Sequence, residues 1–171
     1  MNKVALNTLI RQGVFYGDLK VGLTKQDVES RLGHPLNDVY IDTPDLSHYI
    51  LEMKDGQMLS ALFDKKDVCF ELKLDLEENK QVDIGLQWYD HWESINEDTS
   101  LERLLTILTD LNIDWEFDGQ RVYLQTLCIQ LNNGLRLYYA FGEKAQGDYG
   151  FFSIRSLWDS HELTRIDFSK D

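Results

Sequence analysis

Residues 68–76 have the sequence VCFELKLDL, in which large apolar side chains occupy every second position. Because successive side chains of a β-strand point to opposite faces, this period of two predicts a strand with one buried and one wetter face. The expected buried face carries Val68, Phe70, Leu72, Leu74 and Leu76, and the expected wet face carries Cys69, Glu71, Lys73 and Asp75. Such alternation is typical of antiparallel sheets, so this stretch predicts an antiparallel architecture.

A short helix is expected upstream of this strand. Thr24 is a good N-cap, Asp27 places a carboxylate in the first turn, and Gly33 ends the helix. A second short helix is expected at residues 4–12 from the spacing of its apolar side chains. The second half of the chain predicts a longer amphipathic helix at residues 99–111, whose apolar stripe is leucine-rich.

Strands and turns follow the helix in each half. The first half predicts strands at 46–52, 58–63 and 68–76, with turns at 54–57 and 64–67. The second half predicts strands at 113–117, 121–131, 135–141 and 148–157, a loop at 142–147 and a tail at 160–168. Each half is thus expected to be a helix followed by an antiparallel meander.

An offset of 76 residues superposes Thr24 on Ser100 and aligns the helices and several strand residues of the two halves. We therefore predict an α+β chain of two tandem helix-plus-antiparallel-sheet units, residues 1–86 and 87–171, that arose by internal duplication and form one compact molecule. A chain of 171 residues is long enough to bury a core without disulfides or metals.

The charge balance is strongly acidic. The chain has 30 acidic and 17 basic residues, a net charge of −13. Residues 64–118 hold 16 acids and 5 bases, so this window alone carries −11. Such a field repels nucleic acid and anionic lipid, and it speeds encounter with a basic protein. The plainer interpretation is that the acids only maintain solubility.

The sequence favours a cytoplasmic setting. Neither a signal-peptide pattern at the start nor an apolar run of roughly 18 to 20 residues is found, so no membrane association is expected. Cys69 and Cys128 both lie in strand-like apolar runs and are expected to be buried free thiols, with a single disulfide as the alternative.

Residues 22–35 have the sequence GLTKQDVESRLGHP, a glycine, a capped helix and a Leu-Gly-x-Pro ending. This pattern resembles the start of helix-plus-sheet modules in outer-membrane assembly lipoproteins and in the beta-lactamase inhibitor protein. In the latter, two modules stand in tandem and grip an enzyme on a concave sheet surface. The layout also resembles small acidic immunity proteins of bacterial toxin systems. The chain has no lipobox cysteine, and its second half has Thr109-Asp110-Leu111 in place of the Gly-x-Pro ending.

The sequence predicts no catalytic residue, no metal site and no cofactor, and therefore no enzyme. No two of the four histidines stand three or four residues apart, as a local zinc site would need. A calcium-like run from Asp75 to Asn79 has Lys80 in place of the required glycine. Phosphate-binding loops, nucleophile motifs and basic-aromatic patches are also missing, so no nucleic acid partner is expected.

Residues 87–100, QWYDHWESINEDTS, join the two halves and interleave aromatic with acidic side chains. That composition is typical of protein interfaces, in which aromatic anchors are surrounded by a charged rim. The residues predicted to bind a partner are Asp75, Glu77, Glu78, Trp88, Tyr89, Asp90, Trp92, Glu93, Glu97 and Asp98. In the structural alternative, both tryptophans cover the seam between the halves and the acids form a solvated face.

The resemblance and the charge together imply an immunity protein that blocks a basic toxin, for example a nuclease, by steric and electrostatic masking. Two alternative functions stay open, a scaffold or adaptor without inhibitory role and a hydrolase that uses acidic residues. The oligomeric state is also open, because an exposed sheet edge can support a homodimer as easily as a partner strand.

Overall fold

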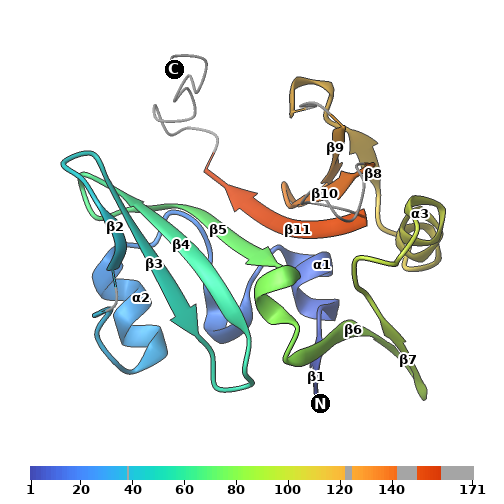
Figure 1. Cartoon of the computed structure of the whole chain (residues 1–171), viewed down its shortest axis with the longest axis horizontal. Coiled ribbons are helices and arrows are strands. Elements are labelled where there is room, and N and C mark those ends of the chain that lie inside the picture. The colour runs from blue at the N-terminus through green and yellow to red at the C-terminus, as the bar shows by residue number, and fades with distance from the viewer. Residues whose placement is uncertain (38, 122–124, 142–149, 159–171) are drawn as a thin grey trace.

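A computed structural model describes residues 1–37, 39–121, 125–141 and 150–158, and it has an α+β fold made mostly of strands (Figure 1). An eight-stranded antiparallel sheet has the order β2-β3-β4-β5-β11-β10-β9-β8, and a three-stranded mixed sheet has the order β1-β6-β7. The strands are β1 (Asn2–Ala5), β2 (Val39–Asp42), β3 (Leu46–Glu52), β4 (Met58–Asp64), β5 (Cys69–Asp75), β6 (Val82–Trp88), β7 (His91–Ser94), β8 (Trp115–Phe117), β9 (Thr126–Leu131), β10 (Arg136–Ala140) and β11 (Gly150–Leu157). The helices are α1 (Asn7–Gln12), α2 (Lys25–Leu32) and α3 (Leu101–Asp110), with 3-10 helices η1 (Tyr16–Asp18), η2 (Glu77–Asn79) and η3 (Gly119–Arg121).

The strand expected at residues 68–76 is confirmed as β5, which lies in the middle of the larger sheet between β4 and β11. Leu72 and Leu74 are fully buried, as the alternation predicts. The alternation alone places Cys69 on the wetter face, whereas its side chain is fully buried, as expected of a thiol in an apolar run. A register shift between β4 and β5 puts Cys69 opposite Phe63 and Glu71 opposite Leu62, so Phe70 is an extra residue in β5 and the alternation is interrupted there.

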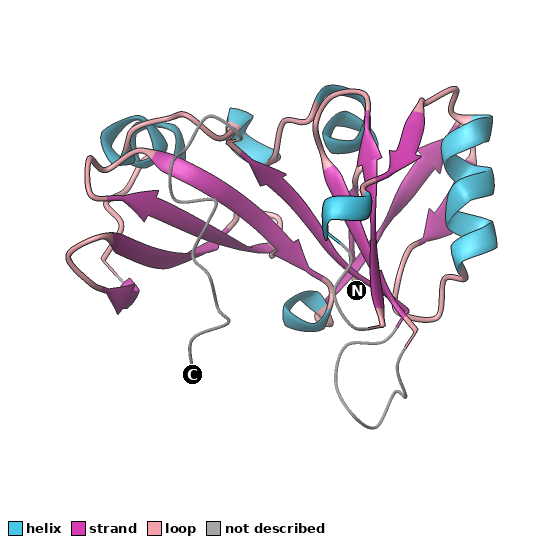
Figure 2. Ribbon diagram, turned by 90° about the horizontal axis from the view of Figure 1, so that it is seen from above, coloured by secondary structure: helices cyan, strands magenta, loops and turns pink. Residues whose placement is uncertain are grey.

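Among the described residues, both halves of the chain share the order of a helix followed by four strands. Helix α2 precedes β2 to β5, and α3 precedes β8 to β11. The two meanders join through their last strands, which run antiparallel with Leu74 opposite Ile154. The two helices stand at opposite ends of the long axis of the molecule (Figures 1 and 2).

No single offset aligns the two halves. The helices begin 76 residues apart, at Lys25 and Leu101, whereas β3 and β9 begin 80 residues apart, at Leu46 and Thr126. Internal duplication therefore stays a prediction. The expected boundary between residues 86 and 87 falls inside β6, and whether the halves are separate domains also stays a prediction.

Several local predictions are confirmed. The Thr24 side chain accepts from the backbone N–H of Asp27, whose carboxylate accepts in return from the N–H of Thr24. Gly33 ends α2 with a φ of 78°. At the turn between β3 and β4, Gly56 has a φ of 90°.

The helix expected at residues 4–12 was wrong in its first part. Only Asn7–Gln12 is helical, whereas Val4 belongs to β1 and lies opposite Ile84 of β6 in a parallel pair. The strands β2, β6 and β7 were not predicted. The loop expected at 142–147 and the tail at 160–168 lie outside the described residues.

Side chains from both halves form one hydrophobic cluster, which includes Phe63, Ile107 and Phe151. Between the halves, the Asn133 side-chain amide donates to the carbonyl of Ile10 in α1 at 2.9 Å. Both cysteines are buried and unbridged, as expected. None of the helices found among the described residues has the length and apolar character needed to cross a bilayer.

Candidate partner-binding surface

The unpredicted strands β6 and β7 turn residues 87–94 of the acidic stretch into a β-hairpin. Trp88 and His91 face each other across a two-residue turn made by Tyr89 and Asp90. Tyr89 adopts a φ of 45° and is 100% exposed. Positive φ in a two-residue hairpin turn is typical of glycine, asparagine and aspartate, so the tip of the hairpin holds an aromatic side chain in a conformation that disfavours it.

Trp92 lies on one face of the three-stranded sheet and covers Gly85. A Cβ added to Gly85 would come within 2.8 Å of the Trp92 ring, so only glycine admits this arrangement. The indole N–H donates to Asp83 at 2.9 Å, and the ammonium of Lys3 lies 5.1 Å from the ring centroid. The Ser94 hydroxyl donates to the second oxygen of Asp83 at 2.6 Å. These contacts fix the ring, and the sequence did not reveal that Asp83 holds it.

The opposite face of the hairpin packs toward α3. Glu93 accepts two hydrogen bonds from the Arg103 guanidinium, of which the Nε–Oε1 bond is 2.5 Å long. Trp88 is half-buried against the core, with its ring centroid 6.1 Å from that of His91. The charge of Glu93 is thus paired within the protein, and Trp88 packs against the core. A role of either residue in partner binding stays a prediction.

The remaining predicted acids lie in three places. Glu97 and Asp98 lie in the turn that leads to Ser100, the N-cap of α3. Glu77 and Glu78 are exposed on η2. Asp75 is separated from the hairpin residues by its place in β5, where its carboxylate lies 2.6 Å from the ammonium of Lys73 and its side chain is only 18% exposed.

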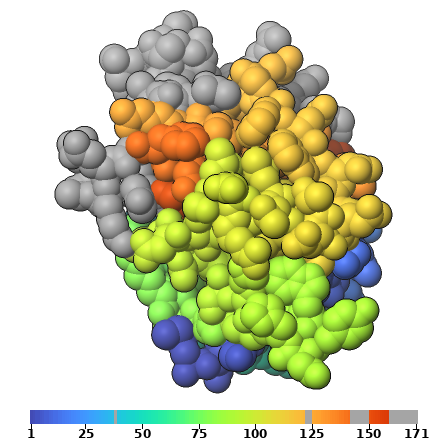
Figure 3. Space-filling model, turned by 90° about the vertical axis from the view of Figure 1, so that its right-hand side faces the viewer, coloured from blue at the N-terminus to red at the C-terminus, as the bar shows by residue number. Residues whose placement is uncertain are grey.

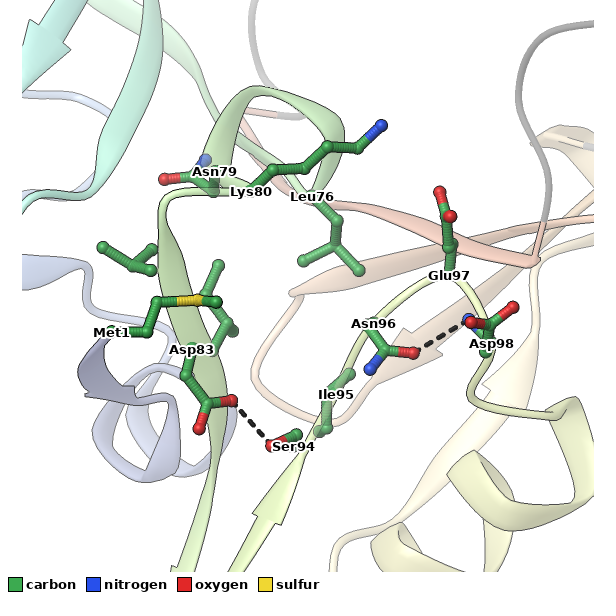
Figure 4. A pocket seen from close by; sticks show the side chains of 12 residues that line it. Met1, Leu76, Asn79, Lys80, Asp83, Ser94, Ile95, Asn96, Glu97 and Asp98 are labelled. Atoms are coloured by element: carbon green, nitrogen blue, oxygen red, sulfur yellow. Dashed lines mark hydrogen bonds between the residues drawn. The ribbon is translucent and has the colours of Figure 1, made fainter.

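A cavity of about 490 Å³ is lined by residues of η2, β6 and the 95–98 segment, with Asp83, Glu97 and Asp98 among them (Figure 4). Figure 3 shows the side of the molecule on which residues of β6, β7 and α3 share one face. We call the hairpin, η2 and the 95–98 segment together the acidic surface. It contains nine of the ten predicted binding residues, Asp75 being the exception.

A second polar region lies on the larger sheet, and we call it the polar sheet face. Its side chains come from one side of β5, β10 and β11, and are Glu71, Lys73, Asp75, Tyr138, Ser153 and Arg155. The Arg155 guanidinium lies 4.6 Å from the Tyr138 ring centroid and 3.9 Å from a Glu71 oxygen. Burial raises the pKa of Glu71, an effect that the charges of Arg155 and Lys73 partly oppose. On this region, charges are paired with one another.

His48 and Ser60 lie on neighbouring strands and are hydrogen-bonded through Nε2 and Oγ. Burial lowers the pKa of His48. A serine beside a histidine is the first requirement for nucleophilic catalysis. Ser60 is however only 1% exposed, so its hydroxyl is not presented to a substrate. Within the described residues, no three His, Cys, Asp or Glu side chains are gathered so as to hold a metal ion.

No protein family, no curated protein and no solved structure matches this chain.

Proposed function

We propose that this chain is an immunity protein that binds a basic toxin and blocks its active site with the tip of the β6–β7 hairpin. The observation that carries the proposal is the conformation of Tyr89. A non-glycine residue in the left-handed region costs roughly 1 kcal/mol, and its fully exposed ring buries no apolar area in return. A fold gains nothing from this residue, whereas an interface gains a rigid aromatic anchor.

The hairpin is held in place without a partner. The Asn7 side chain donates to the Gln87 carbonyl and accepts from the Gln87 N–H, both at 2.9 Å. Trp92 is fixed by its contacts with Gly85 and Asp83. A surface ordered in advance loses little conformational entropy on binding.

The charge around the hairpin supports a basic partner. Glu77, Glu78, Asp90 and Asp98 are exposed on the acidic surface. Carboxylates on one side of a molecule attract a basic protein and raise its association rate, and salt screens this attraction beyond about 8 Å at physiological ionic strength. Masking of a toxin active site needs no bond chemistry from the chain.

Affinity capture from lysate of the source cells tests the proposal, with the native chain and Tyr89→Gly as paired baits. We expect the native chain to retain a basic toxin and to inhibit its activity, with binding that weakens as salt is raised. Tyr89→Gly should weaken this binding by about ten- to a hundredfold, the range of an interface hot spot. Equal capture by both baits would contradict the role of the hairpin, and binding without inhibition would favour a scaffold or adaptor.

Charge-reversal variants test whether the acidic surface accelerates association with a basic partner. The triple variant of Asp90, Glu97 and Asp98 to Lys should slow association by about tenfold at low salt and leave folding intact. Glu93 is omitted because its change would also break the ion pair with Arg103. The matched control reverses Asp45, Glu52 and Glu116, which are exposed elsewhere and give the same change in net charge. Equal slowing by both triples would mean that net charge alone acts.

The cavity supports hydrolysis as the second candidate, because Asp83, Glu97 and Asp98 are among the residues that line it. Paired carboxylates can divide acid and base roles in a hydrolase. Turnover of chromogenic ester, glycoside or phosphate substrates, abolished by Glu97→Gln, would favour this candidate over masking. The same screen without turnover would leave binding as the function.

Two finer features belong to the same proposal. The shared order of α2 with β2 to β5 and of α3 with β8 to β11 supports two duplicated modules. The edge strand β2 exposes Val39, Tyr40 and Ile41, and this supports a homodimer formed by edge pairing. Sedimentation of the native chain and of Tyr40→Lys would test the dimer.

A further inference from the structure

Strand β7 is an open edge of the three-stranded sheet. The strand order β1-β6-β7 leaves its outer side without a neighbouring strand among the described residues (Figure 1). An edge strand presents backbone N–H and C=O groups with which another chain can pair, so natural proteins usually cover or interrupt such edges. The groups that stay open on β7 therefore indicate what this edge can bind.

The register of the hairpin identifies these open groups. Opposite residues of an antiparallel pair alternate between pairs that exchange two backbone hydrogen bonds and pairs that exchange none. The N–H of Ile95 donates to the carbonyl of Ile84 at 2.7 Å, which makes this a bonded pair. The adjacent pair of Gly85 and Ser94 therefore exchanges none, and the same holds for Trp92, two residues earlier on β7. The N–H and C=O groups of Trp92 and Ser94 thus point away from β6, which gives four groups on the outer edge.

The neighbouring backbone groups of the hairpin are satisfied. On the far side of β6, the Asn7 side chain bonds both backbone groups of Gln87 at 2.9 Å and so continues the pairing that β1 begins. Beyond the end of β7, the N–H of Asn96 donates to the Thr99 hydroxyl at 3.1 Å. For the four outer groups of β7, no hydrogen bond is found within the part of the chain that the structure describes.

Strand β7 is held in an extended conformation by contacts within the chain. Trp92 covers Gly85 and donates to Asp83, and Glu93 pairs with Arg103 of α3. A strand that is already ordered loses little conformational entropy when another strand is added to it. The outer edge of β7 is therefore a preformed template for an added strand.

We propose that an extended segment of the basic partner protein pairs with β7 and adds a fourth strand to the three-stranded sheet. Main-chain hydrogen bonds to Trp92 and Ser94 would hold the segment, as in other complexes in which a peptide extends a sheet. The inference rests on the proposed function, because β7 belongs to the same hairpin and the toxin supplies the segment.

The charge of the chain favours a basic segment over a second copy at this edge. Two copies that paired through β7 would bring together two molecules of net charge −13 and their two acidic surfaces. A basic segment instead enters the negative field of exposed carboxylates such as Asp90, which lies in the turn beside β7.

The side chains of β7 indicate what the segment should carry. Residues of the segment opposite Trp92 and Ser94 would lie on the same face as the half-buried Trp92 ring, where β-branched side chains pack well against an aromatic neighbour. Trp92 stands three residues from Tyr89, roughly 10 Å at about 3.3 Å per residue. One partner therefore reaches both the edge and the aromatic anchor.

The probe is the basic heptapeptide acetyl-TKVRVKT-amide, titrated into the full chain while the backbone N–H groups of Trp92 and Ser94 are followed by NMR. We expect saturable shifts with a Kd on the order of 1 mM and slower hydrogen exchange at both groups. The same peptide with both valines N-methylated cannot donate these bonds and should bind about tenfold more weakly. Equal binding of the two peptides, or shifts confined to β2, would overturn the proposal.

A matched pair of variants assigns the binding to this edge. Ser94→Pro removes one outer N–H, and proline is tolerated where that N–H faces solvent. Ser94→Ala is the control, because it shares the loss of the hydroxyl bond to Asp83 but keeps the N–H. We expect Ser94→Pro to bind the heptapeptide about fivefold more weakly than Ser94→Ala, and equal affinities would overturn the proposal. If Ser94→Pro disturbs the hairpin, seen as a shifted Trp92 indole N–H, the N-methylated peptide decides the outcome.

Two further arms separate this inference from its alternatives. A captured toxin that binds Ser94→Pro and Ser94→Ala equally would overturn strand addition and leave the toxin proposal standing. Protection of the Trp92 and Ser94 amides by the heptapeptide, without any captured basic partner, would support the edge site and overturn the toxin proposal. A native dimer that Ser94→Pro dissociates in sedimentation would assign the edge to a second copy and overturn the basic segment.

Discussion

The acidic surface and the polar sheet face use the same residue types in opposite ways. On the polar sheet face, Glu71, Lys73 and Arg155 lie on adjacent strands and their charges are paired within the sheet. On the acidic surface, Asp90 is exposed in the hairpin turn and Glu78 is exposed on η2, and Tyr89 is strained and exposed between the two strands of the hairpin.

The difference separates charges that stabilise a sheet from charges that face a partner. Two opposite charges that are paired on a sheet cancel most of each other's field, so they attract other molecules only weakly. When one of the two is removed, the other is left partly buried without its compensating charge. Carboxylates on turns keep their hydration and project their field outward. We therefore expect changes on the polar sheet face to alter stability, and changes on the acidic surface to alter binding.

The largest change in stability should follow Gly85→Ala, which disturbs the packing of Trp92 on β6 beneath the acidic surface. The new Cβ would lie 2.3 Å from the Glu93 carbonyl oxygen and 2.8 Å from the Trp92 ring, so β6 and β7 must separate. We expect a loss of about 3 kcal/mol in the free energy of unfolding, measured by urea denaturation. Gly119→Ala is the matched control, because a Cβ there meets open space, and it should change stability by less than about 0.5 kcal/mol. Equal stability of both variants would mean that the hairpin is loosely attached.

The next effect tests the polar sheet face. Arg155→Met keeps most of the side-chain volume but removes the guanidinium beside Glu71 and above the Tyr138 ring. We expect a loss of about 2 kcal/mol in the free energy of unfolding, because a mostly buried carboxylate loses a compensating charge. Lys54→Met, at an exposed turn, should have an effect near zero. A small effect of Arg155→Met would place the polar sheet face among ordinary solvated surfaces.

The parts of the fold that sequence predicts correctly are those specified by local chemistry. Each depends only on residues that are near in sequence, and the examples are the alternation around Leu72 and Leu74, the Asp55-Gly56 turn and the Thr24 cap. Strand β1 could not be found this way, since its four residues carry no period and its partner β6 lies 80 residues away.

In the candidate site, too, sequence predicts what depends on local residues and misses what depends on strand pairing. Composition alone pointed to Trp88, Tyr89 and Trp92 as unusual, yet it could not show that one is half-buried, one exposed and one fixed over a glycine. Asp83 was missed because its contact with Trp92 depends on the register of β6 and β7, which sets Gly85 opposite Ser94. The alternation of Asp83, Gly85 and Gln87 with apolar neighbours was the available signal for β6.

A smaller effect of opposite sign should follow Tyr89→Gly. Glycine adopts a φ of 45° without penalty, so we expect a gain of about 1 kcal/mol in the free energy of unfolding, seen as a higher Tm. Tyr89→Ala removes the ring but keeps the Cβ, and it should bring no such gain while weakening partner binding as much as glycine does. A loss of stability in Tyr89→Gly would mean that the exposed ring supports the hairpin, and the argument for an anchor would fail.

The smallest effect is a dependence on pH that belongs to the polar sheet face. Burial raises the pKa of Glu71 in the folded chain, so the folded state favours the protonated carboxyl more than the unfolded state does. Its contribution to stability is therefore full below the ordinary glutamate pKa of about 4.3 and is lost as the pH rises through the folded value. Glu71→Gln has no such proton to lose. The free energy of unfolding of Glu71→Gln minus that of the native chain should thus grow with pH across this window and stay constant above it, as measured by urea denaturation at pH 4 to 8. A difference that shrinks instead would mean that Arg155 and Lys73 outweigh burial, and Glu71 would then stabilise the sheet as an ionised group.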